Sequence, residues 1–295
     1  MTSIRVIGKN GQIGSQLPAS LHSLGNITSV GRTDLELSDA DAIRSLIRAI
    51  KPGVIINAAA YTTVDKAESE AQLAQQINGV APGIMAEEAR RLGSLLVHYS
   101  TDYVFDGLKA TPYVEDDDTN PLGVYGKTKL AGELAIRATG AAHYILRTSW
   151  VYSSGGANFM NTMLRLGRDR PELRIVDDQT GAPTWATTIA DMTAAILTYA
   201  ASHRDDPRHG TYHLTAAGSV TWFGFAQAIF AEAEKTLGLT SPRLIPVTTT
   251  EYHTLAQRPA NSQLDLGRLQ SAFGIQPEPW LCMLEACMRG KTPAG

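Results

Sequence analysis

The sequence predicts an α/β protein built on a doubly wound parallel sheet, with a smaller mixed α/β lobe formed mainly by the C-terminal part. Two observations predict this class. Short apolar runs alternate with longer amphipathic stretches through the first half of the 295 residues, and this alternation ends beyond residue 150. Alternating strands and helices give parallel strands that are joined by right-handed crossovers.

The first half supplies the strands and helices of the predicted sheet. Its strands are short and apolar, as in a sheet covered on both faces, and they are expected at residues 4–7, 26–30, 54–60, 95–99 and 144–147. The helices between them are expected at residues 15–24, 39–50, 71–92 and 125–139. In the second of these helices, Ile43, Ile47 and Ile50 recur at helical spacing.

Beyond residue 150 the pattern becomes mixed. We expect a helix at 158–168, a strand at 173–176, a loop at 177–184 and a helix at 188–201, and from about residue 219 a smaller mixed region. The helix at 188–201 is expected to return to the first sheet. The sequence therefore predicts two interleaved units, residues 1–150 plus about 185–218, and residues about 151–184 plus 219–295.

Composition and charge exclude several classes of protein. The formal net charge is −3, whereas surfaces that bind nucleic acid or anionic membranes need an excess of Lys and Arg. No apolar run approaches the ~18 residues of a membrane span, and the N-terminus enters the first strand without a signal-peptide pattern. Cys282 and Cys287 are expected as reduced thiols. We therefore expect a soluble, cytoplasmic protein that binds neither nucleic acid nor membranes.

A glycine-rich segment, Gly8-Lys9-Asn10-Gly11-Gln12-Ile13-Gly14, follows the first strand and precedes the first helix. In a Rossmann-type fold such a turn brings the backbone against the pyrophosphate of a dinucleotide. The spacing is GxxGxxG rather than GxGxxG, and glycines also serve ordinary tight turns. Its position at the first strand-to-helix turn favours nucleotide binding.

The end of the second strand bears on the choice of cofactor. An acidic residue there would bind a ribose 2′-hydroxyl, whereas an arginine can bind a 2′-phosphate. The chain has Gly31 and Arg32, and no acid before Asp34. This favours NADPH over NADH. The alternative is that Arg32 is a solvated loop cation, which leaves NADH open as the cofactor.

Three polar side chains form the predicted catalytic group. Tyr125 and Lys129 are four residues apart and share one face of a helix, and Thr101 lies at the end of the preceding strand. A nearby lysine cation lowers the pKa of a tyrosine from its usual ~10, so Tyr125 could exchange a proton with an alcohol or sugar oxygen. Thr101 would bond the same oxygen. The alternative is an incidental Tyr–Lys pair on an amphipathic helix.

Seven segments carry a family resemblance across nearly the whole chain. They are residues 8–14 (GKNGQIG), 57–68 (NAAAYTTVDKAE), 98–107 (HYSTDYVFDG), 120–133 (NPLGVYGKTKLAGE), 147–152 (RTSWVY), 177–184 (DDQTGAPT) and 258–262 (RPANS). Together they resemble the nucleotide-sugar branch of the extended short-chain dehydrogenase/reductase superfamily, and within it the family of dTDP-4-dehydrorhamnose reductases.

This resemblance implies reduction of the 4-keto group of dTDP-4-dehydro-β-L-rhamnose to give dTDP-β-L-rhamnose, with the first unit binding NADP(H) and the second the nucleotide sugar. Tyr125 would protonate the sugar oxygen, Lys129 would lower the pKa of Tyr125 and hold the nicotinamide ribose, and Thr101 would polarise the carbonyl. The implied cofactor-binding residues are Gly8, Asn10, Gly11, Gln12, Ile13, Gly14, Arg32, Glu36, Leu37, Ala58, Ala59, Ala60, Tyr61, Thr62, Tyr125 and Lys129. The implied substrate-binding residues are Thr101, Asp102, Tyr103, Trp150, Gln179, Pro183 and Arg258.

The chain also departs from this family. Some members bridge a dimer with Mg²⁺ held by glutamates, and the corresponding positions here are Gln16 and Thr187, neither of which is a carboxylate. We therefore expect no metal there, and a homodimer stays open. Two other functions also stay open: reduction of another 4-keto-6-deoxysugar nucleotide, and a non-catalytic role such as that of methionine adenosyltransferase regulatory subunits.

Several further residues receive a structural interpretation. His98 lies in an apolar strand and is expected as a packed core histidine. The acidic run at residues 115–118 is expected as a solvated loop, and Trp222 is expected in the core of the C-terminal lobe.

Overall fold

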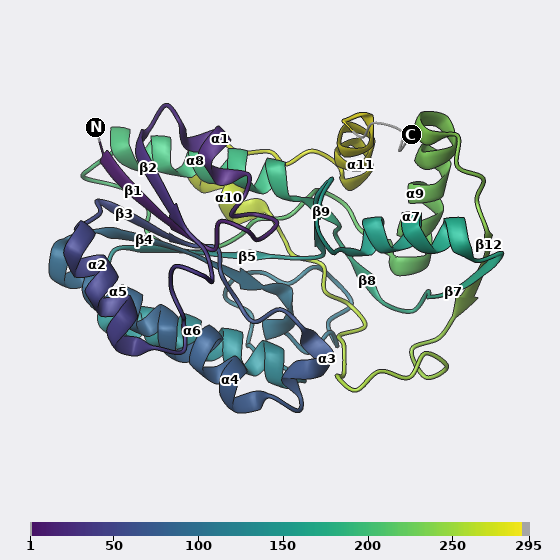
Figure 1. Ribbon diagram of the computed structural model, residues 1–295, viewed down its shortest axis with the longest axis horizontal. Coiled ribbons are helices and arrows are strands. Elements are labelled where there is room, and N and C mark those ends of the chain that lie inside the picture. The colour runs from purple at the N-terminus through teal and green to yellow at the C-terminus, as the bar shows by residue number, and fades with distance from the viewer. Residues whose placement is uncertain (1, 291–295) are drawn as a thin grey trace.

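In the computed structural model, which describes residues 2–290, six parallel strands form the central sheet (Figure 1). These are β1 (Thr2–Ile7), β2 (Gly25–Val30), β3 (Val54–Asn57), β4 (Leu95–Thr101), β5 (His143–Thr148) and β10 (Gly210–His213). Their order is β10-β5-β4-β3-β1-β2, so the chain winds outward in both directions from β1 and β3. The predicted doubly wound parallel sheet is confirmed.

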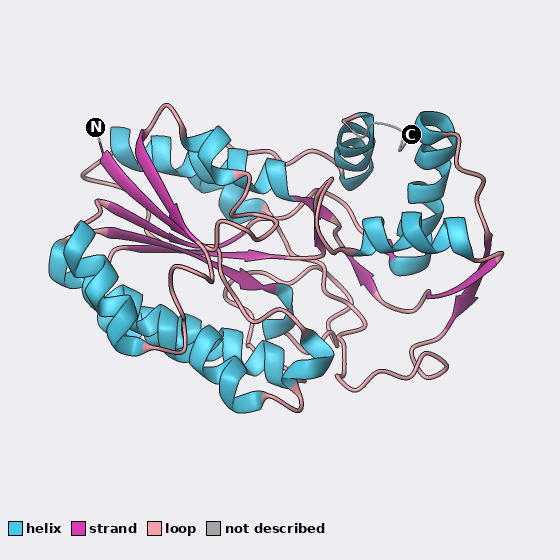
Figure 2. Cartoon of the chain, viewed as in Figure 1, coloured by secondary structure: helices cyan, strands magenta, loops and turns pink. Residues whose placement is uncertain are grey.

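Helices cover both faces of this sheet (Figure 2). One face packs against α2 (Ala40–Ile50), α5 (Ala81–Leu92) and α6 (Val124–Thr139), and the other against α1 (Leu17–Leu21), α8 (Ala186–Ser202) and α10 (Gly267–Phe273). Side chains alternate along β3, so Ile55 enters the first core while Val54 and Ile56 enter the second. This is why the strand is apolar at every position.

The later part of the chain forms a smaller assembly beside the sheet (Figure 1). Here α7 (Phe159–Asp169), α9 (Trp222–Leu237) and α11 (Trp280–Arg289) pack around β7 (Glu172–Val176), which pairs with β12 (Arg243–Val247). Short ladders join β6 (Val151–Tyr152) to β9 (Thr184–Trp185) and β8 (Thr180–Gly181) to β11 (Val220–Thr221). No helix in the described part of the chain is long and apolar enough to cross a membrane.

Several predicted elements differ in the structure. The helix expected at 15–24 is reduced to α1, because turns occupy residues 11–16 and Pro18 stands at its start. The strand expected at 54–60 ends at Asn57, and the three alanines that follow leave the sheet. The loop expected at 177–184 contains β8 and the first residue of β9.

The long helix expected at 71–92 is interrupted. It comprises α4 (Ala71–Gln75), a π-helical turn (Gln76–Val80) and α5. Pro82 has no N–H to bond the carbonyl of Asn78, and that carbonyl instead faces Gly132 of α6, where a Cβ would lie 2.2 Å away. The bulge turns the Asn78 side chain toward Tyr61, where Oδ1 accepts from the backbone N–H at 2.8 Å.

The prediction of a solvated loop at residues 115–118 is wrong for Glu115. Its side chain is buried, and Oε1 accepts a hydrogen bond of 2.9 Å from the backbone N–H of His213 at the end of β10. The other three acids are exposed or half-buried. Glu115 therefore fixes the loop to the edge strand of the sheet.

Candidate active site

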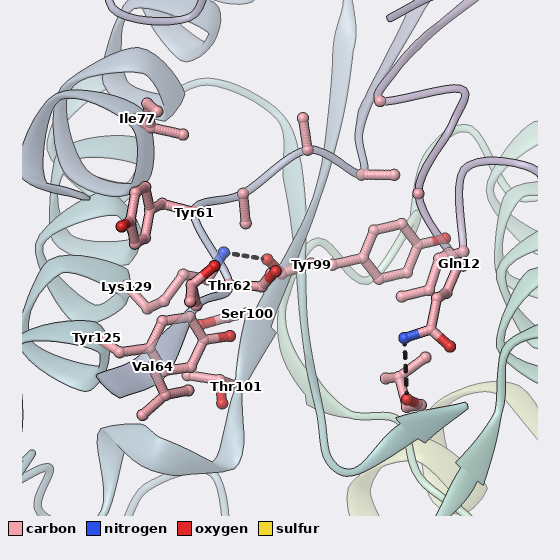
Figure 3. A pocket seen from close by; sticks show the side chains of 18 of the residues that line it. Gln12, Tyr61, Thr62, Val64, Ile77, Tyr99, Ser100, Thr101, Tyr125 and Lys129 are labelled. Atoms are coloured by element: carbon pink, nitrogen blue, oxygen red, sulfur yellow. Dashed lines mark hydrogen bonds between the residues drawn. The ribbon is translucent and has the colours of Figure 1, made fainter. Parts of the chain in front are cut away.

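A cavity of about 1060 Å³ opens where the sheet ends (Figure 3). Its walls come from the glycine turn after β1, residues 58–64 after β3, the end of β4, the start of α6, and residues 148–151 around the end of β5. Parallel α/β sheets bind ligands at this carboxyl edge. The volume slightly exceeds that of a typical single-ligand pocket, which suits a dinucleotide with a second ligand beside it.

The glycine turn is packed tightly against the segment that follows β3. Gly8 has a φ of 101°, and a Cβ there would lie 2.7 Å from the backbone nitrogen of Ala59. A Cβ on Gly14 would lie 2.0 Å from the carbonyl oxygen of Gly8. The turn thus leaves Gly8, Asn10, Gly11, Gln12 and Ile13 lining the cavity, whereas Gly14 lies behind the turn.

Gln12 connects this turn to the C-terminal part of the chain (Figure 3). Its Nε2 donates to the carbonyl oxygen of Val151 at 3.2 Å, and its Oε1 accepts from Asn158 Nδ2 at 3.1 Å. Both polar atoms of the Gln12 amide are therefore hydrogen-bonded, and these bonds fix the side chain in place.

The far end of the cavity is lined by Arg32, Glu36 and Leu37. Asp34, the first acid after β2, is not in this wall. Its carboxylate accepts from Lys9 Nζ at 2.7 Å and from the backbone N–H of Gly31 at 2.8 Å, and these hydrogen bonds hold its pKa below the usual range. Arg32 is thus the charged group nearest the end of β2 that faces the cavity.

The segment after β3 forms another wall of the cavity. Ala58, Ala59 and Ala60 present only backbone and methyl groups, and Tyr61 and Thr62 continue the wall. The Tyr61 hydroxyl donates to Glu70 Oε2 at 2.7 Å. Small side chains here leave room for a flat ligand against the backbone.

The three residues of the predicted catalytic group lie together in the cavity wall (Figure 3). Thr101 Oγ1 donates to Asp102 Oδ1 at 2.9 Å and accepts from the backbone N–H of Tyr103 at 3.1 Å. Burial raises the pKa of Tyr125 to about 12, against an opposing hydrogen bond from Thr101. The phenol therefore keeps its proton at neutral pH.

The expectation that Lys129 lowers the pKa of Tyr125 is wrong for this structure. Lys129 Nζ donates to the carbonyl oxygen of Tyr99 at 2.6 Å and lies beside His98. Lys129 is only 2% exposed, and burial lowers its own pKa to about 8. Removal from water thus dominates the titration of both side chains, and spacing along the helix did not reveal this.

Two tryptophans face the cavity from the opposite side. Trp150, which follows β5, has a φ of 46° and packs on Gly181, where a Cβ would lie 2.4 Å from Trp150 Cε2. Its ring stacks on that of Trp222 with centroids 3.5 Å apart and planes 4° apart. Trp222 packs against the core of the C-terminal lobe, as predicted, and it also lines the cavity, which was not predicted. Nothing near Trp222 in the sequence signals this contact.

Among the described residues, Thr148 Oγ1 has no hydrogen-bond partner, and Asp102 Oδ2 has none within hydrogen-bond geometry, although Ser262 lies close enough to lower the pKa of the Asp102 carboxyl. Burial also raises the pKa of Asp102 to about 7. Buried polar atoms without a partner are costly and uncommon, so these two are suited to bond a polar ligand. Thr148 was not predicted as a site residue, although it lies inside the RTSWVY segment.

Comparison with known proteins agrees with this geometry. Residues 1–292 match the family described as RmlD substrate binding domain. The dTDP-4-dehydrorhamnose reductases of Burkholderia thailandensis and Escherichia coli K12 are 45% and 44% identical, over 97% and 94% of this chain and 98% and 94% of their own. The chain belongs to the dTDP-4-dehydrorhamnose reductase family. A crystal structure of the Bacillus anthracis reductase in complex with NADP superposes with a TM-score of 0.88, at 33% identity, over 97% of this chain and 99% of that chain.

Three residues assigned to the substrate by the resemblance to dTDP-4-dehydrorhamnose reductases do not line this cavity. Gln179 Nε2 donates to Thr249 Oγ1 at 3.0 Å. Pro183 is buried beside the β8 and β9 ladders. Arg258 pairs with Asp65 at 2.6 Å. Asp102, Tyr103 and Trp150, in contrast, are all in the wall.

The positions where some dTDP-4-dehydrorhamnose reductases hold Mg²⁺ do not fit that ion here. Gln16 Oε1 accepts a hydrogen bond of 3.1 Å from Thr187 Oγ1, so the two side chains bond each other. Within residues 2–290 no group of three or more His, Cys, Asp or Glu side chains is placed to hold a metal. Neutral oxygens without a carboxylate make a poor site for a hard cation.

Proposed function

We propose that the protein reduces the 4-keto group of dTDP-4-dehydro-β-L-rhamnose with NADPH, forming dTDP-β-L-rhamnose. The observation that carries this proposal is that Thr101, Tyr125 and Lys129 share one cavity with the glycine turn. Membership of the reductase family supports the choice of substrate. When bound, NADPH supplies the hydride.

The dinucleotide would occupy the wall formed by the glycine turn and the alanines after β3. The close approach of Gly8 to Ala59 leaves backbone rather than side chains facing the cavity, and a pyrophosphate needs this approach. Arg32 would bind the 2′-phosphate, and Glu36 and Leu37 would contact the adenine. Lys129 would hold the nicotinamide ribose. The Bacillus anthracis relative crystallised with NADP supports the choice of cofactor.

Tyr125 would act as the proton donor. Its phenol is protonated at neutral pH because burial raises its pKa to about 12. It can therefore deliver its proton only to an oxygen of comparable basicity, such as the alkoxide that develops on C4 of the sugar. Thr101 donates to Asp102 and accepts from Tyr103, which fixes its hydroxyl next to the reacting oxygen.

The sugar nucleotide would occupy the wall opposite the glycine turn. Asp102 Oδ2 and Thr148 Oγ1 would bond sugar hydroxyls, because within residues 2–290 neither buried atom has a partner in hydrogen-bond geometry. The rings of Trp150 and Trp222 would pack on an apolar face of the ligand. Gln179 and Arg258, which lie outside the cavity wall, would contact the dTDP moiety beyond it, whereas Pro183 is buried and is not available for that contact. In this arrangement residues 1–150 plus about 185–218 bind NADPH and also contribute Asp102, Thr148 and Trp150 to the nucleotide-sugar site, which the remainder of the chain completes.

The test is an assay with freshly prepared dTDP-4-dehydro-β-L-rhamnose. We expect NADPH oxidation, followed by absorbance, with one dTDP-β-L-rhamnose formed for each NADPH consumed. If NADPH binds but is not oxidised with this or another 4-keto-6-deoxysugar nucleotide, the protein is not a reductase. Cys282 is an exposed free thiol, as in proteins of the reducing cytoplasm, and we propose that the reaction takes place there.

A further inference from the structure

Behind the catalytic group lies a buried chain of hydrogen bonds to which the proposed reaction assigns no role. His98 of β4 is 1% exposed and lies between Asn57 of β3 and Lys129 of α6. Its Nδ1 is 3.1 Å from Asn57 Nδ2, and its Nε2 is 3.3 Å from Lys129 Nζ. Burial lowers the pKa of His98 well below its usual value, so the ring is neutral and carries a single N–H.

The position of that N–H follows from Asn57. The backbone N–H of Ala59 donates to Asn57 Oδ1 at 3.2 Å, which fixes the orientation of the amide and turns Nδ2 toward the histidine. Nδ2 can only donate, so His98 Nδ1 accepts. The single proton of a neutral ring must then be on Nε2, where it points at Lys129.

Lys129 can satisfy this N–H only as a neutral amine. An ammonium has three donors and no acceptor, so it would meet the Nε2–H of His98 donor to donor. An amine accepts that bond and still donates to the carbonyl oxygen of Tyr99.

The charged groups around Lys129 compensate an ammonium only in part, because Glu133 raises the pKa of Lys129 by less than burial lowers it. Tyr99 and His98 face it from β4, and Tyr125 and Glu133 from its own helix. The Glu133 carboxylate is already bonded by Ser100, Arg137 and Arg147. In the described part of the chain Lys129 forms no salt bridge, and buried lysines without one are rare.

We propose that His98 is a positioning residue that stabilises the neutral amine of Lys129, through an N–H group that Asn57 directs at Nζ. This role rests on the proposed function, in which Tyr125 donates one proton for each ketone that is reduced and must be reprotonated before the next turnover. A lysine whose amine is stabilised gains and loses a proton near neutral pH, which an ordinary lysine does not.

The direct test is a ¹³C NMR titration of the lysine side chains in the cofactor-free protein, with the Lys129 resonance assigned by its absence from K129Q. We expect a midpoint near the pKa of about 8 in the wild type. In H98Q the amide oxygen can accept from an ammonium, so the midpoint should rise by at least about one pH unit. H98N keeps an amide beside Asn57 but cannot reach Nζ, and its midpoint should rise less.

The matched control is H213Q, which removes another buried histidine whose Nδ1 bonds the carbonyl oxygen of Asp265 rather than a lysine. It should leave the Lys129 midpoint unchanged. A wild-type midpoint at or above about 10, or equal midpoints in the wild type and both His98 variants, would overturn the proposal. The titration needs no turnover, so it separates failure of this role from failure of the proposed reaction.

In an active enzyme the same variants should move the pH profile. The alkaline limb of kcat/KM should shift upward in H98Q together with the NMR midpoint, while NADPH affinity at pH 7 stays within about twofold. A loss of rate without a shift of the limb would show that His98 serves packing alone.

Discussion

The two sides of the cavity are built by different means. On the side of the glycine turn the wall is backbone and small side chains, held by close contacts such as Gly8 against Ala59. On the side of the tryptophans the wall is large side chains, Trp150 and Trp222, together with oxygens of Asp102 and Thr148 that have no partner in hydrogen-bond geometry in the described part of the chain. The first side would accommodate a ligand against exposed backbone, and the second would contact a ligand with large side chains.

This difference predicts how each side responds to mutation. Substitution of a glycine in the first wall should cause a large loss of ligand affinity, because the added methyl group meets backbone that has no room to move. Truncation of one ring in the second wall should cause a smaller loss of ligand affinity, because it removes one contact and leaves the others. Tyr125 lies where the two sides meet, and its replacement should affect chemistry rather than the binding of either ligand.

The largest effect is expected for Y125F. Phenylalanine keeps the edge-on ring contact with Tyr103, whose centroid is 5.9 Å away, but it has no proton to donate. We expect kcat to fall by roughly 10³-fold, while the Kd for NADPH measured by fluorescence changes by less than about twofold. Y113F, which removes a hydroxyl bonded to Asp106 outside the cavity, is the matched control. A Y125F rate near that of the wild type would contradict proton donation by Tyr125.

The next largest effect is expected for G8A, which tests the backbone wall. Alanine is strained at a φ of 101°, and its Cβ would lie 2.7 Å from Ala59 N. Strain of this kind costs about 1–3 kcal/mol, so the Kd for NADPH should rise by roughly 30-fold when measured by calorimetry. G155A adds a methyl group where no atom lies within 4 Å and should bind NADPH normally. Equal affinities in the two variants would show that the turn does not contact the cofactor.

The same contrast explains which parts of the site could be predicted from the sequence. The glycine turn, the alanines after β3 and the Tyr125–Lys129 pair are local patterns, and each lies in the cavity as one segment. Trp222 and Thr148 belong to patterns that also describe a core helix and a strand end. Only the stacking of Trp222 on Trp150, from a distant part of the chain, brings it to the cavity.

Electrostatic behaviour was the least predictable property. The spacing of Tyr125 and Lys129 suggested a lowered phenol pKa, but both side chains are buried and the lysine bonds Tyr99 instead. The parallel strands and the two covered faces followed from the alternation of apolar runs with amphipathic stretches, whereas the π-helical turn at Asn78 depended on Pro82 and on a tertiary contact with Gly132. Periodicity reports which side of an element is buried, and it does not report the hydrogen bonds made there.

A smaller effect is expected for W222A, which tests the side-chain wall. Loss of the stack on Trp150 should raise the KM for the sugar nucleotide by roughly 10-fold, since an aromatic pair is worth about 0.5–1.5 kcal/mol beyond its buried area. The Kd for NADPH should not change. W222F keeps a ring above Trp150 and should show an intermediate KM. If W222A weakened the binding of NADPH and left the KM for the sugar nucleotide unaltered, the two walls would have been assigned to the wrong ligands.

The smallest effect is expected for R32A, which removes the proposed contact with the 2′-phosphate on the backbone side. Arg32 is exposed, and exposed ion pairs contribute about 0.2–1 kcal/mol, so the ratio of kcat/KM for NADPH to that for NADH should fall by about fivefold at most. The fall should shrink at high salt, because screening weakens an exposed phosphate contact. R44A removes a partly exposed arginine of α2 that pairs with Glu87 and should leave the ratio unaltered. If R32A lowered kcat/KM equally for NADPH and NADH, Arg32 would be a solvated loop cation. The backbone side would then bind its dinucleotide without distinguishing the 2′-phosphate.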